Sequence, residues 1–140
     1  MNINYFAVLV AAVAQFIFGA IWYMPIFGKL WGKIHGFDKT PPELQKAMMK
    51  KMPPLLIAQF IFTIVTTVVF ALLLGGFPVD WNIYGLAGFF WLGFIVPTQV
   101  SAVIFGGTDP KWFVQKILIM TFGALGCMMI LAFVMKAFGA

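Results

Sequence analysis

Four apolar runs, each as long as a membrane-spanning helix, constrain this chain more than any other feature. They cover residues 3–23, 55–74, 82–105 and 117–135, and none contains a charged residue or a histidine. A helix of about 20 residues crosses the hydrocarbon core of a bilayer. The runs are continuous rather than alternating, which favours helices over the strands of a membrane barrel. We therefore expect residues 1–140 to form a single all-α integral membrane domain, a bundle of four transmembrane helices.

Composition argues against several classes of protein. The chain is 63% hydrophobic and 9% charged, whereas soluble domains carry about 25% charged residues. This disfavours a soluble enzyme and a nucleic-acid-binding protein. Lysines between the apolar runs, facing anionic lipid, explain the net charge of +5, so we expect membrane lipids and not nucleic acid as partners. With one cysteine, Cys127, and one histidine, His35, we expect no disulfide, no metal site and no cofactor.

The positions of the lysines predict an orientation in the membrane. Eight of the nine lie in the loop of residues 24–54 or around the loop between the third and fourth runs, and Lys136 lies on the other side. Short cytoplasmic loops are enriched in Lys and Arg. We expect both of these loops to face the cytoplasm and both termini to lie outside.

The loops themselves carry helix signals. In loop 24–54 the apolar residues of 26–34 recur at helical spacing, and Thr40 and Glu43 have the spacing of a capping box before a second amphipathic stretch that ends at Met52. We expect both stretches to form short helices on the membrane surface. The loop between the second and third runs is short, and we expect Asp80 to cap the third helix.

A run of aromatic residues after the first span is the best candidate for a ligand or headgroup site. A cation beside aromatic faces can hold an anionic group. The alternative, which we favour, is an aromatic belt at the membrane interface with a lysine anchor. The candidate residues are Trp22, Tyr23, Pro25, Gly28, Lys29 and Trp31.

Neutral polar residues inside the spans are the second group of candidates. They either line a polar pathway or, as we favour, hydrogen-bond between helices. Because none is ionisable, proton-coupled transport is disfavoured. The candidates are Gln15, Gln59, Gln99 and Ser101. We expect the Gln15 amide to bond to another helix, since an unpaired amide is costly in hydrocarbon.

Small residues predict where helices pack closely. Two stripes are expected to face protein: Ala11, Gln15 and Gly19 on the first helix, and Gly85, Gly93 and Ser101 on the third. Pro97 is expected to kink the third helix. The residues of this group are Gly19, Gly85, Gly93, Pro97 and Gly123. Four phenylalanines on the second and fourth helices are expected to face lipid more often: Phe62, Phe70, Phe122 and Phe133.

The sequence of residues 19–31, GAIWYMPIFGKLW, resembles the signature of the uncharacterised bacterial membrane family catalogued as domain of unknown function 1761. The resemblance implies a protein of about this size in the bacterial cytoplasmic membrane, with four spans, a first helix that ends in such an aromatic run, and a polar loop after it. The general plan covers nearly the whole chain. The resemblance brings no activity with it.

Two classes of function fit these features. The first is a small channel or carrier for an ion or small solute. We expect it to be a homo-oligomer, because four short helices leave little room for an internal pathway. The alternative is a non-catalytic membrane subunit, or a lipid-associated scaffold, of a larger complex. We do not expect an enzyme, since the chain offers no acid–base or metal constellation.

Overall fold

The structure is a computed structural model that describes residues 3–76 and 82–139, and within these residues it contains helices and turns but no strand. Four helices are long and apolar enough to cross a membrane, which confirms the predicted all-helical architecture. Their bounds are Tyr5–Ile26, Met52–Gly76, Ile83–Phe105 and Pro110–Ala137. Each agrees with a predicted span to within a few residues, and the fourth helix begins before its span, at Pro110, as the N-cap residue Asp109 followed by a proline predicts.

The long helices are not all regular. The first consists of α1 and a π-helical turn η1, and the third of α5, a π-helical turn η3 and α6; the second is α4, and the fourth is α7 preceded by the short helix η4. Their bounds are α1 Tyr5–Ile21, η1 Trp22–Ile26, α4 Met52–Gly76, α5 Ile83–Phe90, η3 Trp91–Ile95, α6 Val96–Phe105, η4 Pro110–Trp112 and α7 Phe113–Ala137.

Both π-helical turns contain or precede a proline. Pro25 lies inside η1, and Pro97 follows η3 by two residues. A proline has no amide hydrogen and crowds the carbonyl four residues before it, and a π-bulge is one way in which a helix accommodates this loss. The third helix is therefore irregular just before Pro97, where it forms a π-helical turn, and the kink expected there stays a prediction.

The loop between α1 and α4 folds into three short helices: α2 (Gly28–Ile34), the 3-10 helix η2 (Phe37–Lys39) and α3 (Pro42–Lys50). The two predicted helical stretches are thus present, but the predicted capping box is wrong. Pro41 is the N-cap of α3, and the Thr40 hydroxyl donates to the Gly36 carbonyl instead. Pro41 is extended because a residue before proline avoids the helical region, so the helix cannot begin before Pro42.

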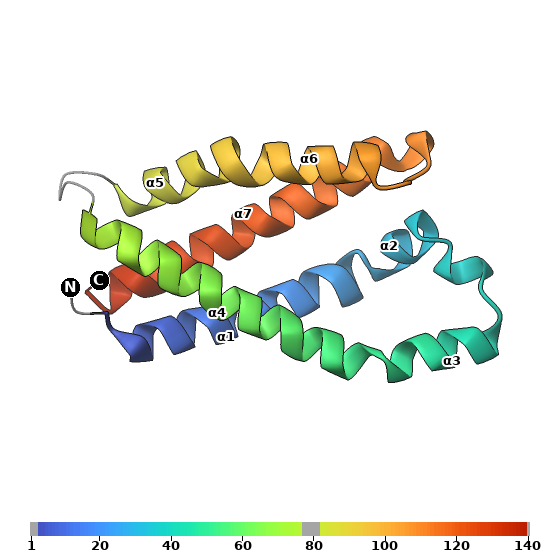
Figure 1. Cartoon of the computed structure of the whole chain (residues 1–140), viewed down its shortest axis with the longest axis horizontal. Coiled ribbons are helices and arrows are strands. Elements are labelled where there is room, and N and C mark those ends of the chain that lie inside the picture. Colours follow the sequence, from blue (N-terminus) through green and yellow to red (C-terminus); the bar gives the residue numbers. More distant parts are fainter. Residues whose placement is uncertain (1–2, 77–81, 140) are drawn as a thin grey trace.

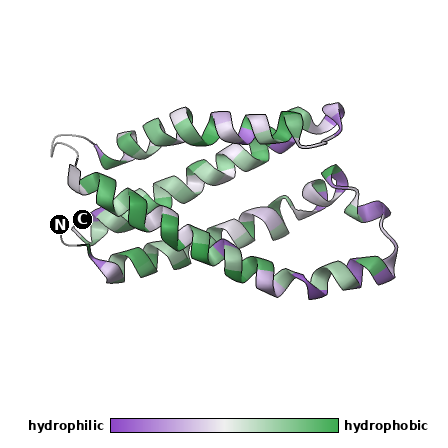
Figure 2. Cartoon of the chain, in the orientation of Figure 1, coloured by the Kyte–Doolittle hydropathy of each residue, from purple (hydrophilic) through white to green (hydrophobic). Residues whose placement is uncertain are grey.

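The helices pack most tightly at the end of the bundle where α1 begins and α7 ends (Figure 1). There α7 packs between α1 and α5, and α4 crosses α1 and contacts it. Buried small and aliphatic side chains fill this end: Ala7, Ala11, Phe70, Ala87, Met128, Leu131, Ala132, Val134 and Met135. At the opposite end lie α2, α3 and the turn before η4, where hydrophilic residues gather (Figures 1 and 2).

Packing predictions for the first and third helices have different outcomes. On α1, Ala11 and Gln15 are buried, as expected, whereas Gly19 is half-buried and a Cβ added there would meet no atom within 4 Å. On the third helix the small-residue stripe faces away from the other helices, so the prediction that it packs within the bundle is wrong. Its residues Gly85, Gly93, Pro97 and Ser101 are all exposed, and a Cβ added at Gly93 would meet no atom within 4 Å.

Three of the four phenylalanines expected to face lipid are exposed. They are Phe62, Phe122 and Phe133, of which Phe62 also lines the cavity described below, whereas Phe70 is buried in the core. Phe70 lies near the end of α4 that crosses α1, where its ring meets that of Phe90 at a centroid distance of 6.5 Å.

The third helix begins at Ile83, and its N-cap is Asn82, whose side chain accepts from the Tyr84 amide. The predicted cap Asp80 lies outside the described residues.

Candidate functional site

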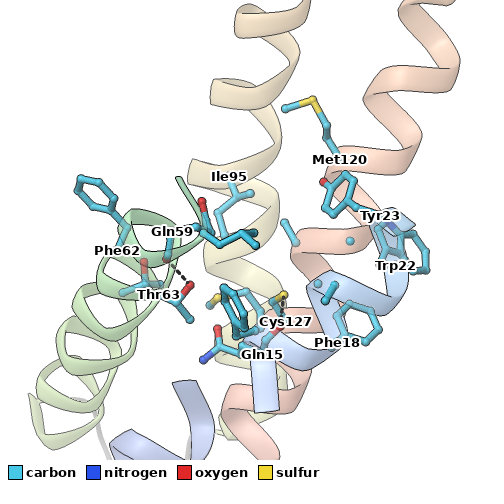
Figure 3. A pocket seen from close by; sticks show the side chains of 18 of the residues that line it. Gln15, Phe18, Trp22, Tyr23, Gln59, Phe62, Thr63, Ile95, Met120 and Cys127 are labelled. Carbon is cyan, nitrogen blue, oxygen red and sulfur yellow. Dashed lines mark hydrogen bonds between the residues drawn. The ribbon is translucent and has the colours of Figure 1, made fainter. Parts of the chain in front are cut away.

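A cavity of about 600 Å³ lies in the half of the bundle nearest α2 (Figure 3). It lies between α1 with η1, α4, the third helix and α7. Its volume is within the usual range for sites that bind small organic molecules. The polar groups in its wall come from three helices: Gln15, Gln59, Thr63, Thr66 and Gln99. Aromatic side chains from the first helix and α2 complete it: Phe16, Phe18, Trp22, Tyr23 and Trp31.

Gln15 is held by bonds inside the protein. Its Nε2 donates to the Thr67 hydroxyl at 2.9 Å and to the Ala11 carbonyl at 3.1 Å. The first bond joins α1 to α4, so the prediction that Gln15 bonds to another helix is confirmed. Thr67 is fully buried and donates in turn to the Thr63 carbonyl at 2.7 Å. This chain of bonds fixes the inner end of the cavity.

Gln99 differs from Gln15 in its hydrogen bonding. Its side-chain oxygen is buried, and the described residues provide it with no hydrogen-bond partner. Buried polar atoms in proteins are nearly always bonded, so this oxygen is an unused acceptor in the cavity wall. Gln59 lies across the cavity on α4 with an exposed side chain, one turn before Thr63, whose hydroxyl donates to the Gln59 carbonyl at 2.9 Å. The cavity therefore offers free amide groups on two sides.

Trp22 is an anchor between helices. Its Nε1 donates to the Ile119 carbonyl of α7 at 2.9 Å, and its ring lies over Gly123. Trp91 makes a matching bond, in which Nε1 donates to the Thr121 carbonyl of α7 at 2.6 Å. Each tryptophan is the first residue of a π-helical turn. The two irregular turns are thus both tied to the same stretch of α7.

The remaining residues of the aromatic run divide between the cavity and the surface. Tyr23 and Trp31 line the cavity, with their rings edge to face at 4.9 Å. Pro25 is exposed in η1, and Gly28 begins α2 beneath the Tyr23 carbonyl. Lys29 is exposed and does not line the cavity.

The sequence suggested that Lys29 lies beside the aromatic rings, but the lysine beside the Trp31 ring is a different one. The ammonium group over the Trp31 ring, 5.8 Å from its centroid, is that of Lys116. Lys116 lies near the start of α7, far along the chain, and proximity in sequence gave no indication of this contact. The aromatic run therefore contributes a wall between the cavity and a lysine of the opposite loop.

Two small residues shape the cavity as well. Gly19 lines it, and a Cβ added there would meet no atom within 4 Å. Gly123 is buried in the wall and gives the Trp22 ring its room. Ser101 is exposed and lies outside the cavity.

The sequence alone does not connect Cys127 to a site. It lines the cavity, with its thiol 3.8 Å from the Gln15 carbonyl. The sequence gives little indication that Cys127 lines a cavity, because a lone small residue on an apolar helix is usually a packing residue. Within the described part of the chain, no three His, Cys, Asp or Glu side chains gather where they could hold a metal ion.

Comparison with known proteins gives a family and no activity. No curated protein and no solved structure matches the chain significantly. The family model described as "Protein of unknown function (DUF1761)" matches residues 6–136, which is nearly the whole chain. The chain, with its four long apolar helices, therefore belongs to the family DUF1761.

Proposed function

We propose that the protein binds a small neutral organic molecule in the cavity between its four long helices and carries it across part of the membrane. The observation that carries this proposal is the buried Gln99 oxygen, an acceptor without a partner among the described residues. A ligand that donates a hydrogen bond would satisfy it. Exposed Gln59 and the aromatic walls favour a molecule with both polar and apolar parts.

The proposal places the binding site within a single chain. From the sequence alone an oligomer axis was the favoured pathway, because four helices left little room inside. The cavity of about 600 Å³ supplies that room. Association into a homo-oligomer remains a proposal of its own, and the mass of the intact complex measures it directly.

The cavity wall also supports binding rather than catalysis. Its polar groups are amides, hydroxyls and one thiol, and none of its lining residues is Asp, Glu, Lys or His. General acid–base chemistry uses groups that gain and lose protons near neutral pH. We propose a non-catalytic role on this basis.

Native mass spectrometry of the protein, extracted gently from its own membrane, tests the proposal. We expect a discrete small-molecule adduct on the wild-type protein. Gly19→Leu should remove it, because the new side chain would extend into the cavity from a position where a Cβ meets nothing. Gln99→Leu should weaken it by removing the acceptor. Ser101→Leu is the matched control, since Ser101 lies on the same helix outside the cavity.

Retention of the same adduct by Gly19→Leu would contradict the proposal. A wild-type protein with no adduct, but with another protein bound at fixed stoichiometry, would favour the alternative of a non-catalytic subunit or scaffold. The same spectra give the number of chains in the complex.

A further inference from the structure

A second cavity, of about 430 Å³, opens at the loop end of the bundle. Two segments far apart in the sequence form it: residues 33–39 at the end of α2, and residues 106–116, which lead into α7. Four lysines lie in its wall: Lys33, Lys39, Lys111 and Lys116. They are nearly half of the basic residues of the chain, brought together from two loops.

These positive charges are not balanced within the cavity. Asp109 is the one carboxylate among the residues that line it, and its oxygen lies 3.9 Å from the Lys111 ammonium group. Both side chains of that pair are more than half exposed, so the pair is weak. Lys33, Lys39 and Lys116 therefore leave a surplus of positive charge, and a cleft lined by charges of one sign attracts ions of the opposite sign.

Part of the wall is held in place before any ligand arrives. The Lys116 ammonium group donates to the Thr108 hydroxyl at 3.2 Å and lies over the Trp31 ring. His35 Nδ1 is 2.8 Å from the Trp31 carbonyl. Because a carbonyl only accepts, this nitrogen carries the hydrogen. Gly107 also lines the cavity, and its φ of 79° suits glycine.

The level of the cavity indicates the chemistry of its ligand. It lies where the first and third long helices end, at Ile26 and Phe105, and where the fourth begins. In a bilayer spanned by these helices, the ends of the helices would lie among the lipid headgroups, and basic pockets between membrane helices bind anionic headgroups. We propose that this cavity is a binding site for a phosphate group, carried either by an anionic phospholipid or by a soluble phosphate ester.

This site is separate from the one in the proposed function. Trp31 lines the inner cavity and carries Lys116 of the outer one on its ring. The inner cavity is lined by neutral groups and the outer one by charged groups. Either proposal can therefore fail without the other.

Binding to protein in nanodiscs tests the proposal. The double variant Lys33→Gln/Lys39→Gln removes two charges of the cavity. The matched control, Lys46→Gln/Lys50→Gln, removes two charges from α3, outside it. In phosphatidylcholine discs containing some phosphatidylglycerol, native mass spectrometry counts retained phosphatidylglycerol. We expect its affinity to fall about tenfold or more in the double variant, since each lysine near an anionic surface is worth roughly a fivefold factor, and to change little in the control.

A second arm distinguishes the source of the phosphate. In discs of phosphatidylcholine alone, inorganic phosphate is compared with chloride at equal ionic strength. A rise in Tm with phosphate, absent in Lys33→Gln/Lys39→Gln, identifies a soluble phosphate ester; retention of phosphatidylglycerol without that rise identifies a lipid headgroup. If the double variant does not fold, Lys111→Gln replaces it. Equal losses in variant and control, or neither ligand binding, would overturn the proposal.

Discussion

Gln15 shows how a polar side chain is accommodated inside an apolar helix. Its amide is 5% exposed and makes two hydrogen bonds, one of them to a different helix. In hydrocarbon an unpaired amide is costly, so the existence of a partner follows from the sequence alone. The identity of the partner does not, because Thr63, Thr66 and Thr67 all lie on α4 and only the crossing of α1 and α4 selects Thr67.

A double-mutant cycle measures this bond. Gln15→Leu, Thr67→Val and the double variant are unfolded in detergent, and their free energies of unfolding are compared. We expect a coupling of about 0.6 kcal/mol, the average for such bonds between membrane helices. The coupling stays small because Gln15 keeps its bond to the Ala11 carbonyl when Thr67 is replaced. Strictly additive effects would show that the bond contributes nothing to stability.

Gly123 provides a second test, in which a single carbon atom is added beside the Trp22 ring. A Cβ added there would lie 2.7 Å from Trp22 Nε1, closer than real side chains approach. The indole must move, and its bond to the Ile119 carbonyl must lengthen or break. We expect Gly123→Ala to lower the free energy of unfolding by about 1–3 kcal/mol, as overpacking does.

The matched control for this substitution is Gly93→Ala. A Cβ at Gly93 would meet nothing within 4 Å, so we expect its effect to be within about 0.5 kcal/mol. Thermal unfolding of both variants in the same detergent makes the comparison. Equal effects of the two substitutions would contradict the role assigned to the Trp22 ring.

The site residues differ in how well the sequence predicts them. The neutral polar residues Gln15, Gln59 and Gln99 were identified because polar groups are conspicuous in an apolar helix, and all three line the cavity. The contact between Trp31 and Lys116 was not identified, because it joins two loops and depends on how the helices cross. Local chemistry is readable in a sequence, whereas long-range juxtaposition needs the fold.

At the scale of the helices, the sequence pattern predicted where each helix lies in the chain more reliably than it predicted which face of the helix packs against protein. The small residues of the third helix do share one face, but this face points outward. Hydrocarbon and protein interiors are both apolar, so the pattern of a membrane helix does not distinguish a lipid-facing stripe from a packed one. The third helix packs instead through Leu86, Ala87 and Val103, which are buried.

The start of α3 shows a local rule outweighing a sequence motif. Thr40 and Glu43 have capping-box spacing, but the two prolines between them delay the helix by one residue. We therefore expect Thr40→Ala to leave the helicity of α3 unchanged. Gln45→Ala should loosen it, because Gln45 Nε2 joins α3 to the preceding turn through the carbonyls of Phe37 and Thr40.

Hydrogen exchange of the α3 amides distinguishes these two variants. We expect faster exchange in Gln45→Ala than in the wild type, and wild-type exchange in Thr40→Ala. The opposite order would restore Thr40 as the cap of this helix.

At the scale of the whole molecule, the bundle has a packed end and an end that holds two cavities. The core residues gather where α1 begins and α7 ends. Towards the loops, α4 and the third helix line opposite sides of the inner cavity, and the cationic cavity lies beyond it. The sequence predicted the number of spans and the sharing of one end by the two basic loops. It did not predict the cavities, because these depend on crossing angles that composition leaves undetermined.

Which side of the membrane this end faces is the last prediction. The lysines of both loops, including those of the cationic cavity, lie at one end of the bundle, and Lys136 lies near the other. Since lysines in short loops favour the cytoplasm, we expect the cavity end to face inward. On a Cys127→Ala background, Lys46→Cys should resist an impermeant thiol reagent in intact cells and react after permeabilisation, whereas Phe138→Cys should react in both. The reverse pattern would place the cationic cavity on the outside, and labelling of both residues in intact cells would mean that the chain inserts in two orientations.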